Sequence, residues 1–168
     1  ELSSYYQYIT IPIDTLKTSI ILFLNEMLCL SIKETEADTE LFHYIENSIF
    51  LLDNLEDGFL NFHIIFLIQL TSYLGFYPNS NYSSENCYFD LQAGSFVSSM
   101  PSHGYSLNKE LSFLFYELLS LSVSDCSKIQ FNGYQRKKIL KAIIQYYMFH
   151  IDGLGEIKSI KVLEEVVA

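Results

Sequence analysis

The sequence lacks the cysteine content of a disulfide-stabilised protein. Its three cysteines, Cys29, Cys87 and Cys126, lie far apart along the chain and cannot all pair with one another. This usage fits a reducing compartment better than a secreted disulfide scaffold. We therefore expect a cytoplasmic protein, with Cys29 and Cys126 buried as small hydrophobic residues and Cys87 the most exposed of the three.

The sequence also shows no leader and no clear membrane anchor. It opens with Glu1 in a polar and aromatic stretch, which predicts no signal peptide. Because Glu1 stands where Met is usual, we expect that an N-terminal part has been removed. Residues 59–77 carry no Asp, Glu, Lys or Arg over 19 positions, which approaches the length of a membrane span. Several polar residues in this stretch would be costly in lipid, so it predicts a buried central helix instead: Asn61, His63, Gln69, Thr71 and Ser72.

Catalytic and cofactor-binding motifs are absent from the sequence. The segment GLGE at residues 153–156 lacks the third glycine and the preceding strand of a dinucleotide site, and no Gly-x-x-x-x-Gly-Lys-Ser/Thr occurs. The four histidines show no His-x-x-x-His spacing, which helical metal ligands often use. We predict that the chain is not an enzyme and holds no metal or other cofactor.

His63 is the histidine whose position needs a choice between two interpretations. A helical period places it within a stripe of apolar residues, namely Phe59, Phe66, Leu67, Leu70 and Leu74. A functional His63 would be a proton shuttle or a metal ligand, whereas a structural one would be hydrogen-bonded to a backbone carbonyl or a hydroxyl group. Since no cysteine or carboxylate lies nearby in a suitable pattern, we favour the hydrogen-bonded core histidine.

Apolar and aromatic residues are plentiful, which argues against disorder. Hydrophobic residues make up 49% of the chain, with 13 tyrosines and 13 phenylalanines. The apolar period predicts six helices, each ending near a capping or turn residue. Their expected ranges are about 15–32, 39–57, 59–74, 107–121, 132–150 and 157–167. The second begins after Asp38 or Thr39, and Asp14, Ser106 and Asn132 are the expected N-caps of the first, fourth and fifth, with Gln135 completing a capping box.

One long stretch, residues 78–106, breaks the helical period. Within it, YFDLQAGSFVSS alternates around Ala93-Gly94 as a β-hairpin would, over about residues 88–97. We therefore predict one mainly α domain over residues 1–168: a compact bundle of about six helices with a small β-hairpin insertion.

Positive charge is scarce and unevenly placed. Residues 1–127 hold three basic and sixteen acidic residues, a formal charge of −13, whereas residues 128–168 hold seven basic and four acidic residues, a charge of +3. A basic run at a helix start is mildly unfavourable beside the positive end of the helix dipole. The run is either a solvated face or a docking site for an acidic partner or DNA phosphate. The candidate contacts are Arg136, Lys137, Lys138, Lys141, Lys158 and Lys161.

Several segments together resemble the C-terminal domain of the bacterial RecO family, in the form found in Bacteroides-type bacteria. They are NFHIIFLIQLTSYLGFYPN (61–79), YFDLQAGSF (88–96), YYMFHIDGLGEIKSIKVLEEV (146–166), IPIDTLKTSIILFLNEML (11–28) and LFHYIENSIFLLDN (41–54). No single motif is decisive, but their order and spacing cover nearly the whole chain.

This resemblance implies a role in DNA repair and homologous recombination. Family members carry an N-terminal oligonucleotide-binding barrel, expected here before the chain, bind single- and double-stranded DNA, and anneal strands. They also help load RecA onto DNA coated by the single-stranded DNA-binding protein SSB. The resemblance implies as partners the acidic SSB tail, RecR, and also RecF and RecA, in a cytoplasmic, nucleoid-associated setting. The alternative is a purely structural helical scaffold that supports the barrel.

The chain departs from the family pattern in two places. Many relatives have a four-cysteine zinc site after the segment that resembles LGFYP, but only Cys87 falls in that region here, so zinc is not expected. Relatives also often have His-x-Pro-Gly where this chain has His150-Ile151-Asp152-Gly153, which keeps the turn without its stiffening proline.

Overall fold

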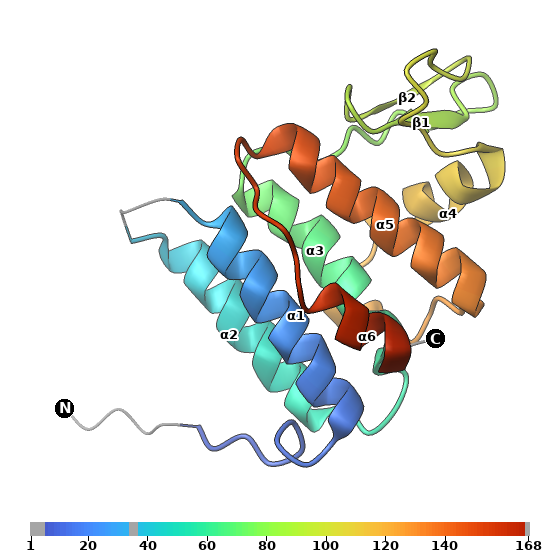
Figure 1. The fold of residues 1–168 in the computed structure, drawn as a ribbon. Coiled ribbons are helices and arrows are strands. Elements are labelled where there is room, and N and C mark those ends of the chain that lie inside the picture. The colour runs from blue at the N-terminus through green and yellow to red at the C-terminus, as the bar shows by residue number, and fades with distance from the viewer. Residues whose placement is uncertain (1–5, 34–36, 167–168) are drawn as a thin grey trace.

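The computed structural model describes residues 6–33 and 37–166 and confirms a mainly helical domain with one β-hairpin (Figure 1). Its α-helices are α1 Thr15–Ser31, α2 Thr39–Asn54, α3 Phe62–Tyr73, α4 Lys109–Leu119, α5 Gly133–His150 and α6 Ile160–Val166. Two short 3-10 helices, η1 Phe59–Asn61 and η2 Val123–Asp125, and the strands β1 Tyr88–Asp90 and β2 Ser95–Val97 complete the described elements.

Helix starts lie where side chains can cap the free backbone N–H groups. Asp14 accepts hydrogen bonds at the start of α1, and Asp38 accepts one at the start of α2. Asn132 and Gln135 form the predicted capping box of α5. Because these signals lie within four residues of the helix that they begin, the sequence alone was sufficient to place them.

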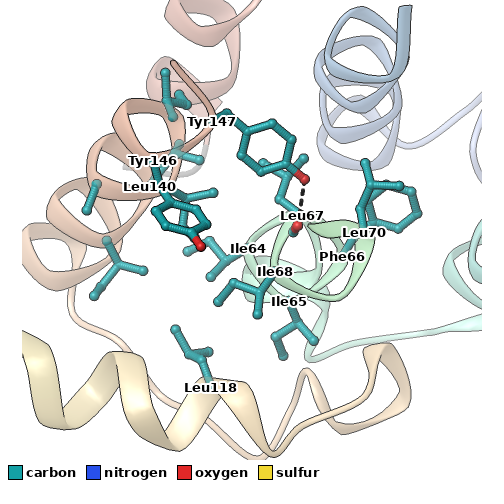
Figure 2. Packing of buried hydrophobic residues seen from close by; sticks show 14 of the residues in the cluster. Ile64, Ile65, Phe66, Leu67, Ile68, Leu70, Leu118, Leu140, Tyr146 and Tyr147 are labelled. Atoms are coloured by element: carbon teal, nitrogen blue, oxygen red, sulfur yellow. Dashed lines mark hydrogen bonds between the residues drawn. The ribbon is translucent and has the colours of Figure 1, made fainter. Parts of the chain in front are cut away.

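The core is built around α3, which is apolar on almost every side. It packs against α1, α2, α4 and α5, and nine of its residues, including His63, are buried. In Figure 2, α3 side chains face Leu118 of α4 and Leu140 of α5. The Tyr147 hydroxyl of α5 donates a hydrogen bond of 2.7 Å to the Leu67 carbonyl oxygen, so a polar group is satisfied inside the core. No helix in the described part of the chain is long and apolar enough to cross a membrane.

The hairpin pairs Tyr88 with Val97 and Asp90 with Ser95, in the predicted place. Gly94 turns the chain at φ 65°, and a Cβ atom there would lie 2.9 Å from the Tyr146 hydroxyl oxygen, so both conformation and space favour glycine. The hairpin also changes the expected start of α4. The Leu107 N–H donates a hydrogen bond of 2.9 Å to the Phe89 carbonyl oxygen, which keeps Leu107 out of the helix.

Three helix starts therefore differ from the prediction. Helix α3 begins at Phe62 rather than residue 59, since Phe59–Asn61 form the 3-10 helix η1. The other two differences concern α4 and α6. Helix α4 begins at Lys109 with Asn108 as its cap, not after Ser106. Helix α6 begins at Ile160 rather than near residue 157, because the Glu26 carboxylate of α1 accepts from the N–H groups of Lys158 and Ser159 at 2.9 and 2.7 Å. Both corrections arise from contacts with residues distant in sequence; the expected last helical residue, Val167, lies outside the described residues.

Two of the three cysteine predictions are also wrong. Cys29 is exposed, because it falls outside the buried stripe of α1 formed by residues such as Phe23 and Met27. Cys87 is buried where the chain enters β1, and Cys126 is buried as predicted. All three thiols are free.

The segment before α1 is held by a buried carboxylate on α2. Asp53 accepts from the backbone N–H groups of Ile9, Thr10 and Ile11, with shortest distances of 2.9, 2.8 and 2.8 Å, and from the Tyr6 hydroxyl at 3.0 Å. Burial opposes ionisation of this carboxyl, but the hydrogen bonds from Ile9, Ile11, Tyr6 and Thr10 outweigh it and lower the pKa of Asp53 to about 2. The leading segment is thereby fixed to the bundle.

Lys17 on α1 contributes a buried cation to the same region. Its Nζ atom donates to the Thr10 hydroxyl at 2.7 Å and to the Asp53 backbone carbonyl at 3.1 Å. It also lies 5.0 Å from the centre of the Phe59 ring. The ammonium group therefore has polar and aromatic partners that offset its loss of water.

Candidate partner-docking surface

The candidate surface is formed by α5 and α6, which lie on one side of the bundle (Figure 1). The basic run begins four residues after the Asn132 cap, at Arg136. Because successive helical residues point about 100° apart, the side chains of this run diverge. The structure separates the six predicted contacts into one buried side chain and five exposed ones.

Arg136 points inward, which corrects its assignment to the exposed face. Its side chain is part of the core edge at 8% exposed, with Nε donating to the Asn61 Oδ1 atom and a terminal nitrogen donating to the Phe131 carbonyl oxygen, both at 3.0 Å. The reason is its place on the helix: Arg136 precedes the buried Leu140 by four residues and therefore shares its stripe. Arg136 thus joins α5 to Asn61 and Phe131 and is not part of the exposed surface.

Lys137 joins the two helices of the surface. Its Nζ atom lies 3.5 Å from the Glu164 Oε2 atom of α6, in an ion pair whose lysine is 56% exposed. Lys161 precedes Glu164 by three residues, so it lies one helical turn away on α6. Lys158 is exposed just before α6 begins.

Lys138 and Lys141 form the basic part of an exposed stripe on α5. The stripe also contains Tyr134 and Met148, which are 63% and 45% exposed. The Lys138 Nζ atom lies 5.6 Å from the centre of the Tyr134 ring, a cation–π contact. The spacing 134, 138, 141, 148 keeps all four side chains on one helical face.

Tyr134 and Met148 were not among the predicted site residues. Their signal was present in the sequence, since they lie four residues before Lys138 and seven after Lys141 on the polar face of the helix. We call Tyr134, Lys138, Lys141 and Met148 the α5 stripe. It combines two cations with an aromatic and a flexible apolar group, which are the kinds of group that bind an acidic ligand with an apolar side chain.

His63 lies in the core, close enough to Arg136 for the guanidinium charge to affect its pKa. It is fully buried, as predicted, but the predicted hydrogen bond is wrong: neither ring nitrogen has a hydrogen-bond partner among the described residues. Burial first, and then the positive charge of Arg136, lower the pKa of His63 to about 3. The imidazole is therefore neutral near pH 7, and it makes a T-shaped contact with the Phe23 ring, with the ring centres 6.1 Å apart.

In the described parts of the chain, residues 6–33 and 37–166, no group of three or more His, Cys, Asp or Glu side chains is placed so that it could hold a metal ion. His103 instead pairs with Asp90 of β1 at 3.3 Å and accepts from the Tyr105 N–H at 3.0 Å. These contacts hold the irregular stretch together.

The family model described as "Recombination protein O C terminal" matches residues 13–159. The chain belongs to this family. The DNA repair protein RecO of Azobacteroides pseudotrichonymphae is 36% identical over 99% of this chain and 69% of that protein. The RecO proteins of Phocaeicola vulgatus and Flavobacterium psychrophilum are 34% and 35% identical, over 99% and 94% of this chain and 69% and 64% of the relatives. No solved structure matches the chain significantly.

Proposed function

We propose that the chain acts in DNA repair and homologous recombination as the helical domain of a RecO-type mediator. Membership in the recombination protein O family supports this role, as does the similarity to proteins named DNA repair protein RecO. In the whole protein, the domain would work beside an oligonucleotide-binding barrel that contacts DNA. It would help load RecA onto SSB-coated strands and support strand annealing, with RecR and RecF as further partners.

Within this role, the domain would dock the acidic tail of a partner such as SSB. The observation that carries this proposal is the α5 stripe, in which Lys138 and Lys141 lie between Tyr134 and Met148 on an otherwise acidic protein. Carboxylates of the tail would bind the lysines, and its terminal aromatic ring would pack on Tyr134 or Met148. Lys137, Lys158 and Lys161 would add a second, weaker group of cations on the α6 side.

The test is the affinity of a synthetic acidic peptide ending in phenylalanine, measured by fluorescence anisotropy. The double substitution Lys138→Glu/Lys141→Glu should weaken binding at least about ten-fold, which corresponds to about 1.4 kcal/mol. Lys109→Glu is the matched control, because Lys109 is an exposed lysine on α4 that also lies over a tyrosine, Tyr88. Equal affinity of the double variant and the control would exclude this docking site.

A scaffolding role is the second candidate, and one observation favours it. The hydrogen bonds from Ile9, Thr10 and Ile11 to Asp53 hold the segment before α1 rigidly against the bundle. Such an anchor would fix the orientation of a domain that precedes this segment. If the peptide fails to bind while Asp53→Ala alters DNA annealing by the whole protein, the scaffold is the better description.

A further inference from the structure

A small apolar cavity opens between α1 and α2. These two helices lie side by side, apart from α5 (Figure 1). It has a volume of about 210 Å³ and is lined on its sides by Ile21, Leu28 and Ile49. The fully buried Phe66 of α3 forms its floor. The cavity is smaller than the roughly 300–1,000 Å³ of typical small-molecule sites. Its size suits a single apolar side chain.

One large apolar side chain is exposed at this opening, and another is exposed further along α2. Leu22, which lines the cavity, is 55% exposed, and Phe42 is 59% exposed. Phe42 precedes Ile49 by seven residues and so lies on the same face of α2. An apolar depression with exposed apolar residues beside it is typical of a protein-binding surface.

The polar groups at this surface favour a cationic partner. Helices α1 and α2 are wholly described, and their one lysine or arginine is Lys17, which is buried. The exposed His43 of α2 lies 3.5 Å from the Glu46 carboxylate. Glu46 is exposed on α2, between Phe42 and Ile49 on the same face. An acidic tail would be repelled here, whereas lysine or arginine side chains would be attracted.

Asn25 adds a polar group to the edge of the cavity. It lines the cavity, is exposed, and makes no side-chain hydrogen bond to any residue that the structure describes. A side-chain amide offers both donor and acceptor groups. It can therefore form a hydrogen bond with a polar side chain of a helix that lies across the opening.

We propose that the α1–α2 groove, defined by Leu22, Asn25, Phe42, Glu46 and Ile49, docks a basic amphipathic helix of a partner protein. One aliphatic or aromatic side chain of that helix would fill the cavity above Phe66, and flanking lysines or arginines would lie near Glu46. Because its chemistry is opposite to that of the α5 stripe, this surface recruits a different partner from the acidic tail. The inference does not rest on the proposed function.

The test uses two synthetic amphipathic helices with leucine at the same positions, one with lysine and one with glutamate on the polar face. The lysine peptide should bind the chain at least about ten-fold more tightly than the glutamate peptide. Leu22→Gln/Phe42→Gln should weaken binding of the lysine peptide about ten-fold, and Glu46→Lys about three-fold. Phe113→Gln, a change to an exposed aromatic residue on α4, is the matched control and should leave the affinity within about two-fold.

Cys29 supplies a separate readout of position. It is exposed, seven residues after Leu22 on α1, while the other two cysteines are buried. Bound lysine peptide should slow alkylation of Cys29 in the starting chain and not in Leu22→Gln/Phe42→Gln. Equal binding of both peptides, or binding of the lysine peptide that survives the double substitution, would overturn the proposal.

A second copy of the chain is the competing occupant. Sedimentation of the chain at rising concentration decides between them, because self-association abolished by Leu22→Gln/Phe42→Gln would assign the groove to a second copy and overturn the proposed partner. The variant Lys138→Glu/Lys141→Glu should bind the lysine peptide with unchanged affinity. Failure of the acidic-tail site would therefore leave this inference standing.

Discussion

The Asp53 carboxylate and the His63 imidazole are almost equally buried, at 2% and 0% exposed, but their surroundings differ. Asp53 is ionised and accepts hydrogen bonds from three successive backbone N–H groups. His63 is held neutral, with neither nitrogen bonded to a described residue and the charge of Arg136 nearby. Burial alone therefore does not decide whether a polar group stabilises the fold; the convergence of donors does.

Of the substitutions considered, Asp53→Ala should cause the largest loss of stability. One buried donor, the Ile11 N–H, and three part-buried donors would lose their acceptor. At about 1–3 kcal/mol for a buried donor and less for the others, we expect a loss of about 4 kcal/mol in the free energy of unfolding. Urea denaturation near pH 7 measures it. Asp57→Ala, which removes an exposed carboxylate four residues later, is the control and should change stability by less than about 0.5 kcal/mol. Similar losses in both variants would contradict the role given to Asp53.

Arg136→Met should destabilise the fold by about 2 kcal/mol. It keeps an apolar side chain but leaves the Asn61 Oδ1 atom and the Phe131 carbonyl without the guanidinium donors. Lys141→Met, an exposed change on the same helix, should have almost no effect on the denaturation midpoint. The Arg136 variant also sharpens the comparison, because removing its charge should raise the pKa of His63. A chain in which both substitutions cost the same would show that Arg136 is not a core residue.

His63→Leu should stabilise the chain by about 1 kcal/mol near pH 7, because an unbonded polar group is replaced by an apolar one. The pKa of His63 is lowered from 6.5 to about 3, so the unfolded chain binds the extra proton between these values. Proton binding to His63 in the unfolded state thus lowers the stability of the starting chain as pH falls from about 6.5 towards 3. The advantage of His63→Leu should grow over the same range in urea titrations. A constant difference between the two proteins would disprove this account.

Lys137→Ala should change the free energy of unfolding by no more than about 0.5 kcal/mol, since an exposed ion pair with Glu164 contributes little. Adding salt should reduce even this difference. The measurement sets the lower limit of the comparison, because both side chains of this ion pair keep contact with solvent. A loss above about 1 kcal/mol would show that the contact between α5 and α6 is a structural one.

Local signals made much of the fold predictable. The Asp14, Asp38 and Asn132 caps and the hairpin around Gly94 each depend on residues only a few positions apart. The starts of α4 and α6 were missed, because the Phe89–Leu107 pairing and the Glu26 contacts join distant parts of the chain. No local pattern reports such contacts.

The site was partly predictable for the same reason. The exposed lysines of α5 followed from charge and helical period, and that period also placed Arg136 in the buried stripe with Leu140. Its charge led to the wrong assignment, because arginine is buried only when acceptors such as Asn61 and Phe131 surround it, and these come from elsewhere in the fold. The apolar α1–α2 groove had no sequence signal, since Leu22 and Ile49 look like ordinary helix residues until both helices are placed.

The contact between Glu26 and Ser159 has a consequence for the order in which the chain is made. These residues are 133 positions apart, so at about 5–20 residues per second the ribosome takes roughly 7–27 seconds to supply the partner of Glu26. Throughout that interval, α1 exists without the helix that covers it. A nascent chain therefore exposes this flank of α1 until residues 158–166 have been synthesised and α6 can pack against it.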